Sequence, residues 1–173
     1  MALDLQSILI ILKASYPDPL WFMPLLILLV LAWVSFVDAR TGRVPDGPVV
    51  GMFLVALFSL AYVSGWHVAV VPFLYAVAAV VVLRLSNQLY FKLCNHDAFG
   101  FGDAKWTALA VLGFGVKPVA WAWVFAAWLA LVWMGLRKLW ARFSPTYAGH
   151  CYVHFAPFLF LGLLIALVVL KTL

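Results

Sequence analysis

The hydrophobic residues of this chain fall into long runs that are separated by short polar stretches. A membrane-spanning helix needs about 20 mostly apolar residues, or somewhat fewer where the side chains at its ends reach the interface. Five runs meet that measure: Leu20–Val37, Pro48–Trp66, Val68–Leu85, Val119–Leu136 and Phe155–Leu170. A sixth run, Trp106–Val116, is too short to span alone, and we expect it to cross as a short helix buried by its neighbours. The pattern predicts an all-α polytopic membrane bundle of about six transmembrane helices.

Composition supports the membrane assignment. Hydrophobic residues make up 68% of the 173 residues and charged residues 10%, whereas a soluble domain would need far more polar surface. We expect one membrane domain over residues 1–173, with its transmembrane core at 20–171. A cleaved signal peptide requires basic residues before its apolar stretch, and none precedes Leu5–Leu12. We therefore expect residues 1–19 to lie in the membrane interface.

The basic residues support six crossings. If the Asp38 end of the first span is cytoplasmic and the crossings alternate, three basic residues lie outside: Lys13, Lys117 and Lys171. The other eight of the 11 Lys and Arg residues lie on the cytoplasmic side: Arg40, Arg43, Arg84, Lys92, Lys105, Arg137, Lys138 and Arg142. This asymmetry is what the positive-inside rule predicts, and it disappears if the short crossing is omitted. The topology also brings Asp38 and Asp103 to the same membrane face.

The net charge of +5 is therefore no sign of nucleic-acid binding. We expect the basic residues to orient the protein in the membrane and to contact anionic lipid head groups. Tryptophan is common at membrane interfaces. We expect that position for four tryptophans near span ends: Trp21, Trp66, Trp106 and Trp140.

Two aspartates provide the candidate chemistry. All six acidic residues are Asp, and ionisable groups at membrane depth are costly unless they have a function. In the run Gly100-Phe101-Gly102-Asp103, the glycines permit positive φ and close approach of another backbone, such as an extended peptide. In the first turn of a helix, Asp103 would be stabilised by the helix dipole, whereas Asp38 at a helix C-terminus would feel the opposite sign. Two such carboxyl groups can share one proton and hydrolyse a peptide bond as acid and base.

Three motifs occur in order along the chain: Asp38-x-Arg40-Thr41-x-x-Val44-Pro45, Phe99-Gly100-Phe101-Gly102-Asp103-x-Lys105 and Phe155-Ala156-Pro157-Phe158-Leu159-Phe160-Leu161-Gly162. Together they resemble the type IV prepilin peptidase family of GxGD intramembrane aspartyl proteases. The resemblance implies catalytic roles for Asp38 and Asp103. We expect the reaction to need no cofactor. It also implies cleavage of a short basic leader after a Gly, at the cytoplasmic face of the bacterial inner membrane. The implied partners are the bilayer and a prepilin or pseudopilin, whose processing serves pilus assembly or secretion.

The chain departs from the family pattern at two places. Asp46 follows Pro45, where the family commonly has Asn. Larger members carry a cysteine-bearing methyltransferase segment between the first two spans, but here only about ten residues separate these spans and no Cys quartet exists. We therefore expect no methyltransferase activity. The short form resembles peptidases of Flp or tight-adherence pilus systems.

Further residues are assigned to substrate binding or loop shaping: Gly100, Gly102, Arg40, Lys105, Asp46 and Pro157. For Arg40 and Lys105, an interfacial or lipid-phosphate contact is an alternative. Pro157 fits the first turn of the last helix, where a missing N–H costs little. Asp97 is interpreted as a turn former.

Two other readings compete with the peptidase. One is metal binding by Cys94, His96, Asp97, His150, Cys151 and His154, since His residues four apart on a helix can share a face and bind zinc. The chain has no Glu and these residues come from two loops, so we assign no metal. The other is a non-enzymatic transporter or assembly component with broken helices. Transporters place polar groups near the bilayer midplane, whereas these acids lie at one face.

Overall fold

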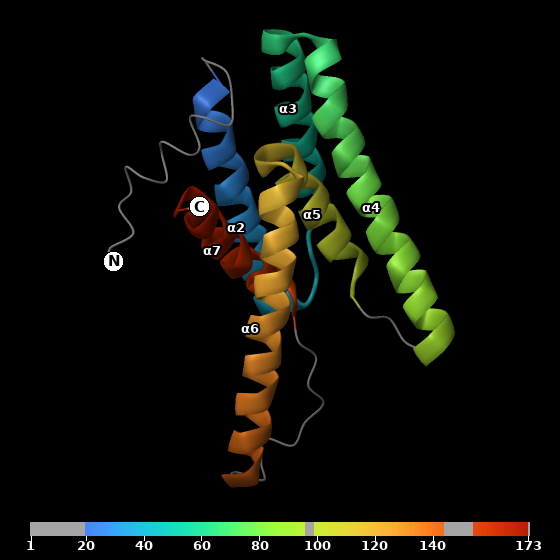
Figure 1. Ribbon diagram of the computed structural model, residues 1–173, viewed down its shortest axis with the longest axis vertical. Helices are drawn as coiled ribbons and strands as arrows, with labels where there is room; N and C mark the ends of the chain where they lie inside the picture. The colour runs from blue at the N-terminus through green and yellow to red at the C-terminus, as the bar shows by residue number, and fades with distance from the viewer. Residues whose placement is uncertain (1–19, 96–98, 144–153, 173) are drawn as a thin grey trace.

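The computed structural model describes residues 20–95, 99–143 and 154–172. After the 3-10 turn η1 (Leu20–Phe22), the described residues form six α-helices: α2 (Met23–Thr41), α3 (Asp46–Ser64), α4 (Trp66–Cys94), α5 (Phe101–Phe114), α6 (Val116–Phe143) and α7 (Ala156–Thr172) (Figure 1). The described part of the chain contains no β-strand. The prediction of an all-α bundle is therefore confirmed, and the expected interfacial segment 1–19 lies outside the described residues.

Each predicted apolar run corresponds to one helix. Within the described residues, α2, α3, α4 and α6 are long and apolar enough to cross a membrane, and α7 is a shorter apolar helix. The fourth helix, α5, has 14 residues, a length of about 21 Å against a hydrocarbon core of about 30 Å. Ten of its residues are buried by neighbouring helices. α5 is therefore the short, enclosed helix that the sequence predicts.

Two helices extend beyond their apolar runs. α4 ends at Cys94 instead of Leu85, and α6 ends at Phe143 instead of Leu136. The added stretches contain Leu, Lys, Arg and Gln, which have high helix propensity, so the backbone stays helical after the apolar pattern stops. α4 stops where Asn95 takes a left-handed conformation with φ 59°, which Asn tolerates better than most residues.

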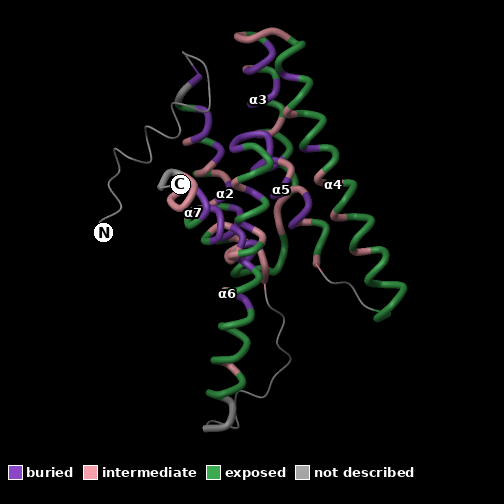
Figure 2. Tube along the Cα trace, in the orientation of Figure 1, coloured by how far each residue is buried: buried purple, intermediate pink, exposed green. Residues whose placement is uncertain are grey.

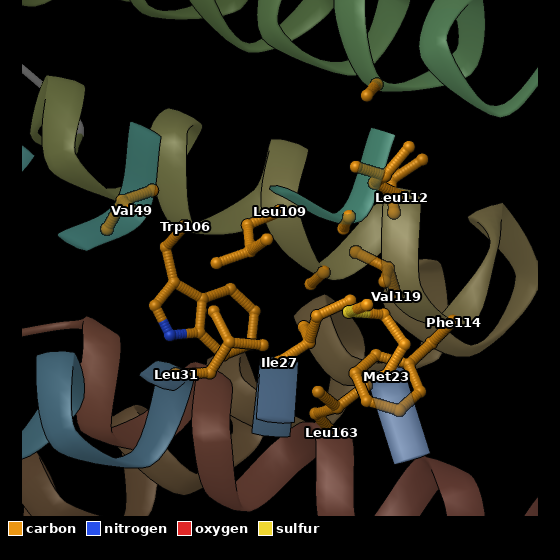
Figure 3. Close-up of a cluster of buried hydrophobic side chains, with 14 of the residues drawn as sticks. Met23, Ile27, Leu31, Val49, Trp106, Leu109, Leu112, Phe114, Val119 and Leu163 are labelled. Carbon is orange, nitrogen blue, oxygen red and sulfur yellow. The ribbon is translucent and has the colours of Figure 1, made fainter. Parts of the chain in front are cut away.

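The core is built around α5. Trp106 is fully buried, and it lies in one hydrophobic cluster with Ile27 and Leu31 of α2 and Leu163 of α7 (Figure 3). The prediction that Trp106 is an interfacial residue is therefore wrong, because the neighbouring helices enclose α5 from its first turn onward. Trp66 and Trp140 are exposed, as an interfacial position requires, and the side chain of Trp21 is not described.

The outer faces of α4 and α6 are apolar and uncovered. Figure 2 shows that most of α4 and most of residues 131–140 of α6 are exposed. Large hydrophobic side chains such as Leu85, Leu89, Leu131 and Trp133 lie on them. An apolar surface of this extent would be unfavourable in water but is what a bilayer solvates. With its several apolar helices, the chain is a multi-pass membrane protein.

α6 and α7 approach each other closely at one glycine of the third motif. A Cβ atom on Gly162 would lie 2.3 Å from the carbonyl oxygen of Ala122 and 3.0 Å from the amide nitrogen of Ala126. Small residues let membrane helices pack backbone against backbone. Gly162 therefore sets the distance between α6 and α7, and with it the position of the N-terminal end of α7.

We predict that Gly162→Ala destabilises the protein. The added methyl group meets backbone atoms that cannot move aside, and overpacking of this kind costs about 1–3 kcal/mol. Thermal unfolding in one detergent measures the effect. Gly135→Ala, on the same helix as Ala122, is the matched control, because a Cβ atom at Gly135 meets nothing within 4 Å. We expect this variant to be neutral or slightly stabilising. Equal unfolding midpoints for the two variants would contradict this role for Gly162.

Candidate active site

Four helix ends meet at one end of the bundle. The C-terminal end of α2 and the N-terminal ends of α3, α5 and α7 lie in the same region, in the lower half of Figure 1. Asp38 is in the last turn of α2 and Asp103 in the first turn of α5. Their exposed fractions are only 7% and 6%. The structure thus brings together the two aspartates that the sequence singled out, both shielded from the surroundings.

Asp103 is held by the start of its own helix. Its Oδ2 accepts a hydrogen bond of 3.2 Å from the backbone N–H of Gly100, and its own N–H donates to the Gly100 carbonyl oxygen at 3.2 Å. The predicted place in the first turn of a helix is confirmed, and the free N–H groups and dipole of that turn favour a negative charge.

Asp38 is held by a different helix. Its carboxylate accepts a hydrogen bond from the backbone N–H of Ala156, the first residue of α7, and it interacts electrostatically with Asp103. The sequence placed Asp38 only at the unfavourable C-terminus of α2. The tertiary structure adds the N-terminus of α7, whose dipole has the favourable sign. Both carboxyl groups therefore face a helix N-terminus.

A hydrogen bond between side chains joins the two aspartate-bearing helices. The indole Nε1 of Trp106 donates to Ser35 Oγ at 3.2 Å, and Ser35 Oγ donates to the Ala156 carbonyl oxygen at 3.1 Å. Ser35 precedes Asp38 by three residues, and Trp106 follows Asp103 by three residues. Each partner is thus about one helical turn from an aspartate on the same side of its helix. This pair of bonds holds α2, α5 and α7 together beside the two carboxyl groups.

A second bond of the same kind connects α5 to α6. Trp123 Nε1 of α6 donates to Thr107 Oγ1 at 3.1 Å, and Thr107 Oγ1 donates to the carbonyl oxygen of Asp103 at 2.7 Å. The Trp123 ring also packs against Phe99, with centroids 5.5 Å apart, and Phe155, at 5.3 Å. Trp123 therefore links the segments that enter α5 and α7.

Gly102 lets the α2–α3 turn lie directly on α5. A Cβ atom at Gly102 would lie 2.7 Å from Cβ and Cγ2 of Val44. Neither Gly100 nor Gly102 has a positive φ angle, so the expectation of positive φ at these glycines is wrong. The close approach at Gly102 is made by the chain's own turn. Gly100 is more open, since a Cβ atom there would be 3.9 Å from its nearest neighbours.

Lys105 and Asp46 form an ion pair that ties the start of α3 to α5. The Lys105 ammonium group also lies over the Phe101 ring, 4.5 Å from its centroid, and the Arg84 guanidinium of α4 lies 4.6 Å from the same centroid. Asp46 is largely exposed. These contacts connect the starts of α3 and α5 and the side of α4 near the two aspartates.

The remaining candidates are more distant or not described. Arg40 is exposed and stacks on Phe36 of its own helix, with its guanidinium carbon 4.2 Å from the ring centroid. Pro157 is the second residue of α7, as predicted. Among the described residues no group of three or more His, Cys, Asp or Glu side chains gathers. His96, Asp97, His150 and Cys151 lie outside the described residues.

Sequence reasoning missed the residues that position the acids: Ser35, Trp106, Thr107, Trp123 and Ala156. One signal could have found some of them. Ser35 and Thr107 are hydroxyl residues within apolar runs, each at helical spacing from an Asp, where a buried hydroxyl needs a partner. The indole donors come from distant segments, so no local pattern identifies them.

A family model described as the type IV leader peptidase family matches residues 25–170. That range includes both aspartates and all three motifs. Comparisons with curated proteins and with solved structures found no match for this chain.

We predict that Gly102→Ala lowers stability and that Gly100→Ala does not. The first substitution forces the α2–α3 turn off α5 at a cost of about 1–3 kcal/mol, whereas the second has room. Unfolding in detergent compares them. Val44→Gly in the Gly102→Ala background should recover stability because it removes the clashing atoms, and Val44→Ala should not, because the Cβ atom remains. Recovery by neither Val44 variant would show that the clash is not the cause.

Proposed function

Because the chain belongs to the type IV leader peptidase family, we propose that it is an aspartic endopeptidase that removes the leader from prepilin-like proteins. The observation that carries this proposal is the meeting of Asp38 and Asp103, buried and electrostatically coupled, where helix ends converge. Both are within the range matched by the family model, and the rest of the site is arranged to hold them. The family also favours an enzyme over the transporter or assembly component considered above.

The proposed reaction uses one carboxyl group in each protonation state. The carboxylate takes a proton from a water molecule as the water oxygen attacks the peptide carbonyl carbon. The protonated carboxyl donates its proton to the carbonyl oxygen, which yields a tetrahedral intermediate. When the C–N bond breaks, the amine leaving group takes up the proton that the first carboxyl received from water. A hydroxyl of the intermediate returns a proton to the second carboxylate, so that both groups regain their starting states. The products are a new carboxyl end on the leader and a new amino end on the pilin.

The proposed substrate is a membrane protein with a short basic leader followed by an apolar helix, cleaved after a Gly. Support comes from the family and from the position of the acids at the end of the bundle, where a leader emerging from the bilayer can reach them. Processing would serve pilus assembly or secretion. Only residues 42–45 separate α2 from α3, so no methyltransferase segment is inserted there and no N-methylation is proposed.

We predict that Asp38→Asn and Asp103→Asn each abolish leader cleavage. An amide can neither accept the proton of water as a carboxylate does nor donate a carboxylic proton, and loss of such a group costs about 10²–10⁴-fold or more in rate. The measurement is incubation of purified protein with a candidate prepilin, with the new N-terminus identified by mass spectrometry.

Asp46→Asn is the matched control for these two variants. Asp46 is exposed, and the family commonly has Asn at this place, so we expect cleavage to fall only modestly, through loss of the ion pair to Lys105. Retained cleavage in Asp38→Asn or in Asp103→Asn, with normal protein levels, would rule out the acid pair.

We also propose that the site faces the cytoplasm of a bacterial inner membrane, in agreement with the distribution of basic residues. Cys94 at the end of α4 is exposed, at the same end of the bundle as the acids. With Cys151→Ser removing the second thiol, a membrane-impermeant maleimide should label Cys94 in inverted vesicles and not in intact cells. In a Cys94→Ser, Cys151→Ser chain, a cysteine at position 64 should show the reverse pattern, because Ser64 ends α3 at the opposite face. Labelling of Cys94 from outside would invert the topology.

A further inference from the structure

His154 lies against the end of the helix that carries Asp38. A Cβ atom on Gly42 would lie 2.8 Å from His154 Cε1 and 3.3 Å from Nδ1, so the imidazole fills the space that a side chain at residue 42 would occupy. Gly42 ends α2 in the left-handed conformation, with φ 68°, and its N–H donates to the Asp38 carbonyl oxygen at 2.8 Å. The ring therefore packs on the turn that closes the helix at Asp38.

The same short segment interacts with Asp38 in two ways. Ala156, two residues after His154, donates its backbone N–H to the Asp38 carboxylate, and the imidazole of His154 interacts electrostatically with that carboxylate. Ser35 binds the Ala156 carbonyl oxygen at 3.1 Å and keeps this segment in place. Asp38 is thus enclosed between α5, which carries Asp103, and residues 154–156.

We propose that His154 is a positioning residue of the catalytic centre, whose imidazole holds the Asp38 end of α2 by packing on Gly42. The proposal rests on the proposed peptidase function and adds a residue to it. None of the three motifs includes His154, and the sequence pointed to it only as one of several metal-binding candidates.

The imidazole gives the two acids different surroundings. Both face a helix N-terminus, but among the described residues the electrostatic partners found for Asp38 are His154 and Asp103, whereas Asp103 faces Asp38 and the N–H of Gly100. Lys105 is paired with Asp46, and Arg40 stacks on Phe36. His154 therefore distinguishes the surroundings of Asp38 from those of Asp103.

The chain contains a control for the packing part of this arrangement. His67 lies against Gly65, the residue between α3 and α4, in the same way: a Cβ atom on Gly65 would lie 2.8 Å from His67 Cε1 and 3.0 Å from Nδ1, and Gly65 has φ 86°. Gly65 follows the end of α3 that is opposite the acids. His67 thus reproduces the imidazole–glycine packing without the aspartate.

The test compares His154→Phe with His67→Phe, using wild-type protein and a purified prepilin. Phenylalanine keeps an aromatic ring on the glycine and removes the polar nitrogens. We expect His154→Phe to lower kcat about 10-fold or more with KM little changed, because a misplaced group slows the chemical step and not binding. We expect His67→Phe to keep the wild-type kcat, and His154→Gln, which restores a polar side chain, to recover part of the loss.

Unfolding midpoints in detergent accompany the kinetics. If His154→Phe does not fold, His154→Gln and His154→Asn take its place with the same expectation of lowered kcat. A wild-type kcat in these His154 variants, or a rise in KM alone, would overturn the proposal while leaving the peptidase function intact. An equal loss in His67→Phe would overturn it as well, since the effect would then belong to the packing. A wild-type chain that cleaves no prepilin removes the peptidase function first, and the role of His154 with it.

Discussion

The hydrogen bond between Trp106 and Ser35 is the contact on which the geometry of this protein depends. It joins α2 to α5 about one helical turn from each of the two buried aspartates. Ser35 also donates a hydrogen bond to the Ala156 carbonyl oxygen, which joins α2 to α7. In an apolar surrounding a polar group without a partner is costly, so such a bond has no competing solvent and holds its helices in one arrangement. Within the described residues every buried side-chain nitrogen or oxygen has a partner.

Burial of two carboxyl groups at membrane depth requires compensation, and two helix N-termini supply it. Asp103 uses the first turn of its own helix, and Asp38 uses the first turn of α7. The arrangement explains why the third motif, which contains no acid, belongs to the same site: it brings the Ala156 N–H to Asp38 and, through Gly162, fixes α7 on α6. The short α5 fits this scheme, because a helix that stops inside the bundle can place its N-terminal turn beside another helix.

Close contacts at glycine connect the three motifs. Gly102 of the second motif packs against Val44 of the first. Gly42, within the first motif, packs against His154, which immediately precedes the third. These contacts bring the α2–α3 turn, the start of α5 and the start of α7 against one another. The proposed peptidase chemistry follows from this convergence, since neither acid alone can act as both base and acid on one peptide bond.

Much of this organisation could be predicted from the sequence. The apolar runs determine six helices, because a bilayer requires long uninterrupted apolar segments, and the scarcity of acids marks Asp38 and Asp103. The place of Asp103 in a first helical turn and of Pro157 at the start of α7 also follow from local patterns. Helix ends were less accurate, since α4 and α6 continue on helix propensity after their apolar runs stop.

Only the tertiary structure decided what surrounds the two acids. The sequence predicts that Trp106 is an interfacial residue. In the structure it is buried and donates a hydrogen bond to Ser35, 71 residues away. The sequence predicts that Asp38 lies at an unfavourable helix end. In the structure its carboxylate accepts a hydrogen bond from the N-terminus of α7. Gly102 reads as a flexible position and instead makes room for Val44. Local sequence determines which segments are helical and apolar, whereas partners distant in the chain are set by how those helices pack, which no local periodicity encodes.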